Sequence, residues 1–139
     1  MAQENPHAQV SALIFDTDIL VWVHRGHPGA AHFVDLVPAE ERNLSAISYL
    51  ELLYGTRDRA DLRSVQNMVA DLFAEVVPIS KRISASAARL MDSYVLAHRV
   101  DVSDVVIAAT ALDRHETLAT AKRKHFRFIP GINLQAFRP

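Results

Sequence analysis

Three acidic residues, Asp16, Glu51 and Asp104, could lie close together in the folded chain. Asp16 ends an apolar run, Glu51 lies in a predicted helix, and Asp104 opens an alanine-rich segment. Two carboxylates about 4 Å apart near a protein surface repel each other by roughly 4 kcal/mol. A divalent cation removes this cost, and Mg²⁺ or Mn²⁺ prefers oxygen ligands. The three acids therefore predict a metal site, which could hydrolyse phosphodiester bonds with a metal-activated water.

Each acid also has a purely structural explanation. Asp16 could cap the helix that follows it. Ser48 and Glu51 have the spacing of a capping box, with Ser48 at the N-cap and Glu51 at the third helical position. A negative charge at Asp104 would favour a helix start through the helix dipole. The stronger indication is their shared placement, because acids that follow parallel strands emerge at one edge of a sheet.

Strands and helices are expected to alternate along the chain. The predicted strands cover 11–15, 44–47, 73–79, 118–120 and 126–129. The predicted helices cover 19–24, 29–37, 48–55, 57–72 and 103–114, and Ser80 caps a further long helix. This alternation favours an α/β fold of three layers, α/β/α, with a central, mostly parallel sheet covered on both faces.

The composition fits a single globular domain. The chain has 139 residues, of which 50% are hydrophobic and 22% charged. We expect one domain over residues 11–139 after a flexible N-terminus over 1–10. Cysteine is absent, so a metal must be held by oxygen or by histidine. The polar start and the lack of a long apolar run predict a cytoplasmic protein without a membrane segment.

The charge is balanced overall but uneven along the chain. A formal net charge of −1 argues against a protein-wide electrostatic attraction to nucleic acid. Residues 117–139 nevertheless contain no acid and five basic residues, namely Lys122, Arg123, Lys124, Arg127 and Arg138. Two interpretations remain open for this segment, a solvated surface loop and a patch that faces phosphate.

Four segments, in order along the chain, resemble the motifs of PIN domains, particularly those of VapC-type toxins. They are residues 13–20, 45–55, 104–111 and 118–126. The resemblance implies a PIN-like fold and a ribonuclease toxin of a type II toxin–antitoxin pair. It also implies Mg²⁺ or Mn²⁺ as cofactor, with Asp16, Glu51 and Asp104 as metal-binding and catalytic residues. The implied partners are an RNA substrate, a cognate antitoxin and a second copy of the chain.

One residue departs from this family pattern. The family usually carries Asp or Asn two residues after the threonine matched by Thr120, and here that position is Lys122. A protonated ammonium cannot ligate a cation, so we expect three acids, one metal and weaker metal affinity. Alternatively, Lys122 could turn outward to meet RNA phosphate. Asp18 or Asp101 could supply a fourth ligand.

Two other functions are compatible with the sequence. A PIN-like protein in which Lys122 disables the site could bind antitoxin or RNA with weak cleavage or none. The segment 16–18 also has the Asp-x-Asp pattern of haloacid-dehalogenase-type phosphatases. That family expects Thr or Val where this chain has Leu20, and its downstream lysine and acidic pair cannot be placed. Thr17 and Ser48 are further candidates, as groups that hydrogen-bond the carboxylates.

Overall fold

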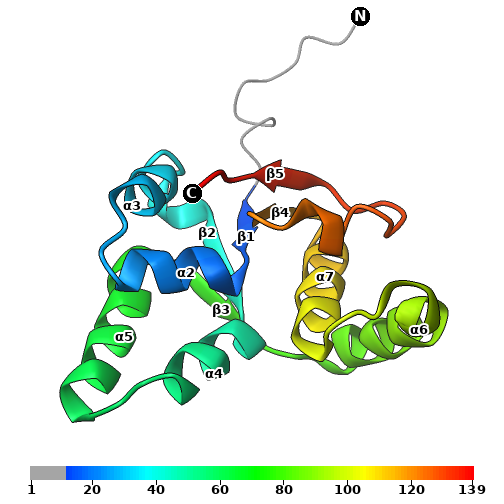
Figure 1. Cartoon of the computed structure of the whole chain (residues 1–139), viewed down its shortest axis with the longest axis horizontal. Helices are drawn as coiled ribbons and strands as arrows, with labels where there is room; N and C mark the ends of the chain where they lie inside the picture. Colours follow the sequence, from blue (N-terminus) through cyan, green and yellow to red (C-terminus); the bar gives the residue numbers. More distant parts are fainter. Residues whose placement is uncertain (1–11) are drawn as a thin grey trace, which may run out of the picture.

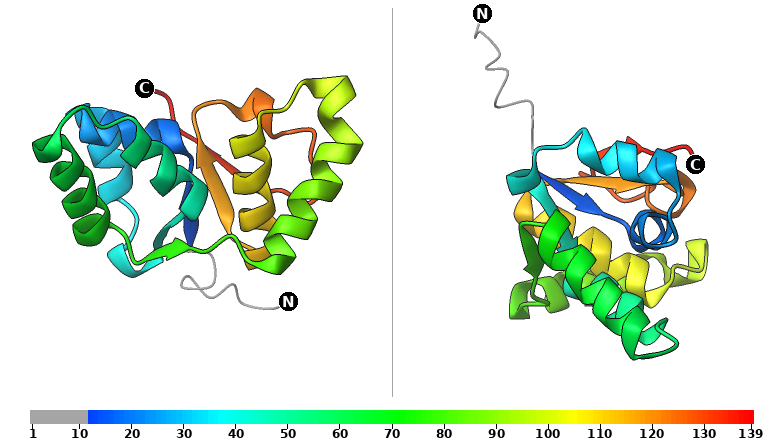
Figure 2. Two further views of the ribbon diagram at one scale, coloured as in Figure 1. Left: turned by 90° about the horizontal axis from the view of Figure 1, so that it is seen from below. Right: turned by 90° about the vertical axis from the view of Figure 1, so that its left-hand side faces the viewer.

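A computed structural model describes residues 12–139, so the expected flexible start over 1–10 lies outside the described residues. The chain forms three layers, in which helices cover both faces of a five-stranded sheet (Figure 1). The two further views show the same separation of the helices into two groups (Figure 2). The predicted fold class is confirmed. No helix within residues 12–139 has both the length and the apolar character needed to cross a membrane.

All strand pairs in the sheet are parallel, and their order is β3-β2-β1-β4-β5. The strands are β1 Leu13–Phe15, β2 Arg42–Ser45, β3 Glu75–Val77, β4 Thr117–Thr120 and β5 Leu134–Ala136. The chain moves outward from β1 on one side and then returns to the other side for β4. Such a switch point, here between β1 and β4, is where open α/β sheets bind ligands, at the carboxyl ends of the strands.

Within residues 12–139, six α-helices and two short 3-10 helices surround the sheet. The α-helices are α2 Thr17–His24, α3 Pro28–Asp35, α4 Ala46–Tyr54, α5 Arg59–Leu72, α6 Lys81–His98 and α7 Val102–Arg114. The 3-10 helices are η1 Ala39–Glu41 and η2 Arg123–His125. As predicted, Ser80 caps α6, and its hydroxyl oxygen accepts the backbone N–H of Ile83 at 3.1 Å.

Successive side chains of β1 enter two different hydrophobic cores. Leu13 and Phe15 pack with residues of α2, α3, α4 and α5, whereas Ile14 packs with residues of α6 and α7. Side chains of a strand alternate between the faces of a sheet, so one short strand joins both cores. A central strand buried on both faces explains why 13–15 is continuously apolar.

Helix α7 lies close to the sheet because its buried face is made of small side chains. Ala108, Ala109 and Ala111 are buried, and α7 contacts β1, β2 and β4. Alanine has no side chain beyond Cβ, so it permits a close approach of helix and strand. This packing fixes the start of α7, and with it Asp104, near the carboxyl ends of the central strands.

The predicted strand at 126–129 is wrong. Phe126 and Ile129 are buried, but the backbone there forms turns, in which the N–H of Ile129 donates to the carbonyl of Phe126 at 3.0 Å. The last strand is instead Leu134–Ala136, which pairs with β4. A short apolar segment can be buried without joining a sheet, and its local pattern does not distinguish the two cases.

Candidate functional site

Asp16 follows β1 directly and is completely buried, with 0% of its surface exposed. Its Oδ1 accepts the backbone N–H of Thr17 and its Oδ2 accepts the hydroxyl of Thr120, both at 2.8 Å. Asp16 is therefore a helix cap and also a part of the acidic site. Burial raises the pKa of Asp16 to about 6, although the positive charge of Lys122 opposes this rise.

Lys122 points into the acidic site. Its Nζ lies 3.0 Å from Oδ1 of Asp104, 3.9 Å from Oδ2 of Asp18 and 4.0 Å from Oδ2 of Asp16. Burial alone would lower the pKa of Lys122, but the nearby charge of Asp16 and the hydrogen bond to Asp104 raise it above its ordinary value. Of the two orientations left open by the sequence, the structure has the inward one.

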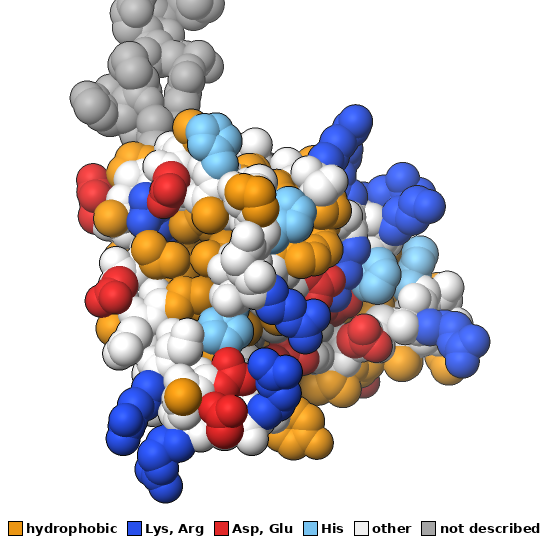
Figure 3. Space-filling view, turned by 60° about the vertical axis from the view of Figure 1, so that its left-hand side comes forward, with side chains coloured by type: hydrophobic (Ala, Val, Ile, Leu, Met, Phe, Trp, Pro, Cys, Tyr) orange, Lys and Arg blue, Asp and Glu red, His pale blue; other side chains and the backbone are white. Residues whose placement is uncertain are grey.

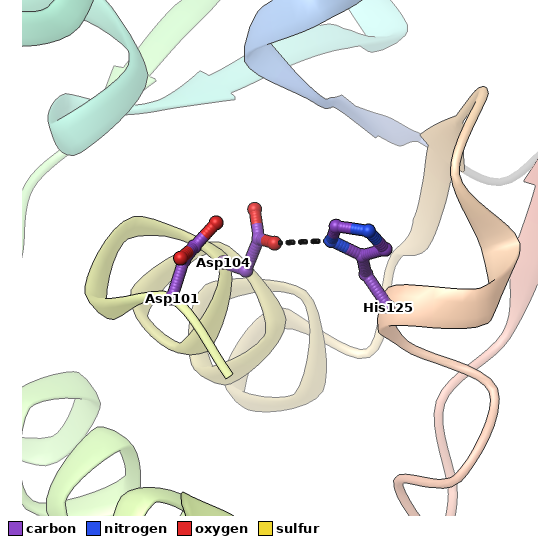
Figure 4. A group of neighbouring side chains, drawn as sticks. All are labelled: Asp101, Asp104 and His125. Atoms are coloured by element: carbon purple, nitrogen blue, oxygen red, sulfur yellow. Dashed lines mark hydrogen bonds and ion pairs between the residues drawn. The ribbon is translucent and has the colours of Figure 1, made fainter. Parts of the chain in front are cut away.

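Asp104 is the third residue of α7 and is only 4% exposed. Its second oxygen, Oδ2, lies 3.0 Å from Nδ1 of His125. Asp101, Asp104 and His125 each offer a possible ligand atom, and these atoms all lie within 4.8 Å of one another. Figure 4 shows the two aspartates at the start of α7, with His125 facing Asp104 from the segment after β4.

No chemical role is predicted for His125 from the sequence. Its one signal in the sequence is its place in the segment after Thr120 that resembles the fourth family motif. A lone histidine among basic residues has no spacing that predicts a ligand. The contact with Asp104 arises only because the short helix η2, Arg123–His125, returns the chain toward α7.

The capping-box prediction for Ser48 and Glu51 is wrong. Helix α4 begins at Ala46, and its cap is Ser45, whose Oγ accepts the backbone N–H of Ile47 at 3.2 Å. The strand β2 ends earlier than predicted, so the helix begins earlier too. Ser48 is therefore inside the helix and buried, with its Oγ 2.8 Å from Oγ1 of Thr17.

The carboxylate of Glu51 accepts hydrogen bonds from two residues that are adjacent in sequence to Asp16 and Asp104. Its Oε1 accepts the hydroxyl of Thr17 at 2.9 Å, and its Oε2 accepts the hydroxyl of Ser103 at 2.8 Å. Thr17 follows Asp16 and Ser103 precedes Asp104. Within the described chain, Glu51 makes no ion pair with Lys122. The structure thus joins Asp16 and Asp104 through the ammonium of Lys122. Glu51 contacts only their chain neighbours among the described hydrogen bonds, and it is not in the described group of ligand atoms that lie within 4.8 Å of one another.

The donor set of this site fits a hard divalent cation. The ammonium of Lys122 is itself a positive charge among carboxylates, because its Nζ lies 3.0 to 4.0 Å from oxygen atoms of Asp16, Asp18 and Asp104. Carboxylate oxygens are the ligands that Mg²⁺ and Mn²⁺ prefer. Asp18 lies on the Lys122 side of Asp104, and Asp101 lies near His125. Both remain candidates for a fourth ligand.

A basic depression adjoins the acidic site. It has a volume of about 460 Å³ and is lined by Lys122 together with Arg123, Lys124, Arg127 and Arg138. A second depression of about 530 Å³ lies between α2, α4 and α5, with Glu51 and His24 in its wall. Acidic and basic side chains lie next to one another on the face shown in Figure 3, so this face does not carry charge of a single sign.

A parallel α/β sheet with buried carboxylates at its switch point defines an α/β domain with a candidate cation site. Residues 13–129 match the family model of the PIN domain, and the chain belongs to the PIN-domain family. The resemblance inferred from the four motifs is confirmed. None of the curated proteins compared with this chain matches it.

Several solved structures share the fold. A chain of a toxin–antitoxin complex from Klebsiella pneumoniae is 27% identical, with a TM-score of 0.71, over 88% of this chain and 95% of that one. A chain of DNA-bound VapBC2 from Rickettsia felis is 21% identical, with a TM-score of 0.75, over 91% and 98% of the two chains. A chain of DNA-bound VapBC from Salmonella typhimurium is also 21% identical, with a TM-score of 0.75, over 92% and 99%.

Proposed function

We propose that this chain is a divalent-metal-dependent endoribonuclease and the toxin of a type II toxin–antitoxin pair. One observation carries the proposal. Two buried carboxylates, those of Asp16 and Asp104, both face the ammonium of Lys122 at the switch point of the sheet. Membership of the PIN-domain family supports a nuclease. The absence of cysteine and the hard oxygen donors support Mg²⁺ or Mn²⁺ as the ion.

In this proposal Asp16, Glu51 and Asp104 hold the metal. When bound, the ion supplies the positive charge that favours attack of water on a phosphodiester. The protein holds the carboxylates in place through hydroxyl groups. Thr120 donates to Asp16, while Thr17 and Ser103 donate to the two oxygens of Glu51. These hydrogen bonds orient the ligands before the ion arrives.

The basic depression supports a nucleic acid as the substrate. Arg123, Lys124, Arg127 and Arg138 line it, next to Lys122 and the acidic site. Basic side chains bind the phosphates of nucleic acids without regard to sequence, and they position the strand. A single strand that crosses this depression would bring a phosphodiester to Asp16 and Asp104.

An antitoxin partner and a homodimer are also part of the proposal. The similar structures from Klebsiella pneumoniae, Rickettsia felis and Salmonella typhimurium are toxin–antitoxin complexes. On this chain, Leu50 and Tyr54 lie one turn apart on α4 and are 55% and 93% exposed. Apolar side chains exposed together mark protein–protein surfaces. Light scattering after size exclusion, with and without a co-expressed antitoxin, would test both partners.

Cleavage assays test the enzymatic part of the proposal. A panel of end-labelled RNAs, and the same sequences as DNA, would be incubated with Mn²⁺, Mg²⁺ or EDTA. We expect metal-dependent cleavage of RNA that Asp16→Asn and Asp104→Asn abolish. Asp71→Asn, which neutralises an exposed acid of α5, is the matched control and should stay active. If the wild type and Asp16→Asn were equally inactive under all conditions, the proposed ribonuclease activity would be refuted.

A second candidate function is an interaction protein that binds antitoxin or RNA and cuts neither RNA nor DNA. The ion pairs of Lys122 favour it, because an ammonium in the acidic site opposes metal binding. In this case the wild type would bind RNA or antitoxin, while its cleavage would equal that of Asp16→Asn. The cleavage panel therefore distinguishes the two functions.

A further inference from the structure

The ammonium of Lys122 lies among the carboxylates that are proposed to hold the divalent ion. We propose that Lys122 is a tethered competitor of that ion: it neutralises the acidic site in the metal-free protein and leaves the site when the ion binds. The inference rests on the proposed metal-binding role of Asp16 and Asp104. It does not require that the protein cut RNA.

The two cations cannot occupy the site together. An ion ligated by Asp104 would lie about 2.0–2.1 Å from a carboxylate oxygen if it were Mg²⁺. The Nζ of Lys122 already lies 3.0 Å from Oδ1 of Asp104 and 4.0 Å from Oδ2 of Asp16. Asp16 and Asp104 would hold the ion with carboxylate oxygens that now face the ammonium, and the two positive charges would repel each other. One of them must leave.

The surroundings of Asp104 make this exchange specific. Its Oδ2 faces His125, so Lys122 holds the oxygen that faces Asp16 and Asp18. Neither Arg123 nor Lys124 makes an ion pair with these acids in the described chain.

Lys122 can leave without a change of the backbone. Its N–H donates to Oγ1 of Thr120 at 3.0 Å, which fixes the main chain at the end of β4. Its side chain is 25% exposed and also lines the basic depression. A lysine side chain is a flexible four-carbon stem, so rotation of this stem moves the ammonium from the acids into the depression.

Metal titration of the full chain tests the exchange. After treatment with EDTA and its removal, Mn²⁺ binding would be measured by calorimetry for the wild type, Lys122→Met, Lys122→Arg and Lys124→Met. Lys122→Met keeps the length of the side chain and removes its charge, so we expect Mn²⁺ to bind roughly tenfold more tightly or better. Lys122→Arg keeps the charge and should bind no more tightly than the wild type. Lys124→Met removes a neighbouring exposed cation and should change the Kd less than twofold.

Two outcomes would overturn the proposal. One is an unchanged or weaker affinity in Lys122→Met, which would place the ion elsewhere, for example at Asp101 and His125. The other is an equal gain in Lys124→Met, which would reduce the effect to general electrostatics. The two proposals can fail separately. If Lys122→Met binds Mn²⁺ more tightly but the protein cuts no RNA, the exchange is supported and the proposed nuclease activity is refuted.

A measurement on the wild type covers the case in which Lys122→Met does not fold. The chain has three lysines, Lys81, Lys122 and Lys124. With ¹³C at Cε, each lysine gives one NMR signal, which Lys81→Arg and Lys124→Arg assign by elimination. Adding diamagnetic Mg²⁺ should shift the Lys122 signal and leave the other two in place. A stationary Lys122 signal at saturating Mg²⁺ would contradict the exchange.

Discussion

The hydroxyl of Thr17 donates to Oε1 of Glu51 at 2.9 Å, across 34 residues of sequence. A hydroxyl has one proton, so with Ser48 Oγ 2.8 Å away the Thr17 oxygen accepts from Ser48 while it donates to Glu51. Thr17 directly follows Asp16, and the turn after β1 therefore positions two of the proposed ligands. The Thr17 side chain therefore connects the start of α2 to helix α4 at the site.

Thr17→Val should weaken the site without removing a ligand. Valine has nearly the same shape, but it leaves Glu51 without its donor from α2. Loss of a partner that orients a metal ligand typically lowers metal affinity or activity about 10–100-fold. We expect a loss in this range in Mn²⁺ calorimetry and in RNA cleavage. Thr56→Val is the control, because the Thr56 hydroxyl donates to the carbonyl of Leu53. Full activity in Thr17→Val would show that Glu51 does not depend on Thr17.

Glu51→Gln tests the role of Glu51 itself. Because Ser45 rather than Ser48 caps α4, Glu51 contributes no cap, and its exposed side chain should be replaceable at little cost in stability. Glutamine can still accept the Thr17 hydroxyl, but it lacks the charge that a metal ligand supplies. We expect an unfolding midpoint close to that of the wild type and a clear loss of Mn²⁺ affinity and cleavage. A fully active Glu51→Gln would exclude Glu51 from the metal site.

Asp16 makes the metal-free protein sensitive to pH. Burial raises its pKa from 3.8 to about 6, so between these values the folded chain binds a proton that the unfolded chain releases. The contribution of Asp16 to stability is therefore full below pH 3.8 and is lost as the pH rises through about 6. Its size is about 3 kcal/mol at most.

Asp16→Asn imitates the protonated state and should remove this dependence. In EDTA at neutral pH, we expect the unfolding free energy of the variant to exceed that of the wild type by about 1–3 kcal/mol. The difference should shrink toward zero as the pH approaches 3.8. Urea unfolding over this pH range measures it, with Asp71→Asn as the control. Parallel curves for the wild type and Asp16→Asn would contradict the raised pKa.

Some of this architecture could be predicted from the sequence because its causes are local. The apolar run at 13–15 followed by Asp16, and the small residues after Asp104, were sufficient to indicate buried elements ending at one edge. The start of α4 was not predictable, because the pairing of β2 with β1 and β3 decides where the strand ends. Nor was the direction of Lys122, which depends on acids from α2 and α7 that are brought together only by folding.

Ser45→Ala tests the corrected start of α4. The Ser45 hydroxyl oxygen accepts the N–H of Ile47, and losing such a cap typically costs about 1 kcal/mol. We expect this fall in the unfolding free energy, measured in urea. An unchanged stability of Ser45→Ala would mean that another group caps the helix.

His125→Ala should impair the site through Asp104. The imidazole Nδ1 lies 3.0 Å from Oδ2 of Asp104, and its loss frees a carboxylate that is otherwise held on both oxygens. We expect cleavage and Mn²⁺ affinity to fall about tenfold or more, with partial recovery in His125→Gln. An equal loss in Asp101→Asn would indicate that Asp101 and His125 bind the ion directly.

The basic depression predicts a salt-dependent affinity for RNA. Each phosphate contact on a single strand contributes about 0.7 to the slope of log K against log salt concentration. Arg127 and Arg138 line the depression and are exposed, so their double replacement by alanine should lower this slope by up to about 1.4. Fluorescence anisotropy with labelled RNA between about 50 and 200 mM salt, in EDTA to prevent cutting, measures the slope. Arg59→Ala together with Arg63→Ala removes two exposed charges from α5 and should leave the slope unchanged. An equal fall in both double variants would mean that RNA responds to the total charge of the protein rather than to the depression beside Lys122.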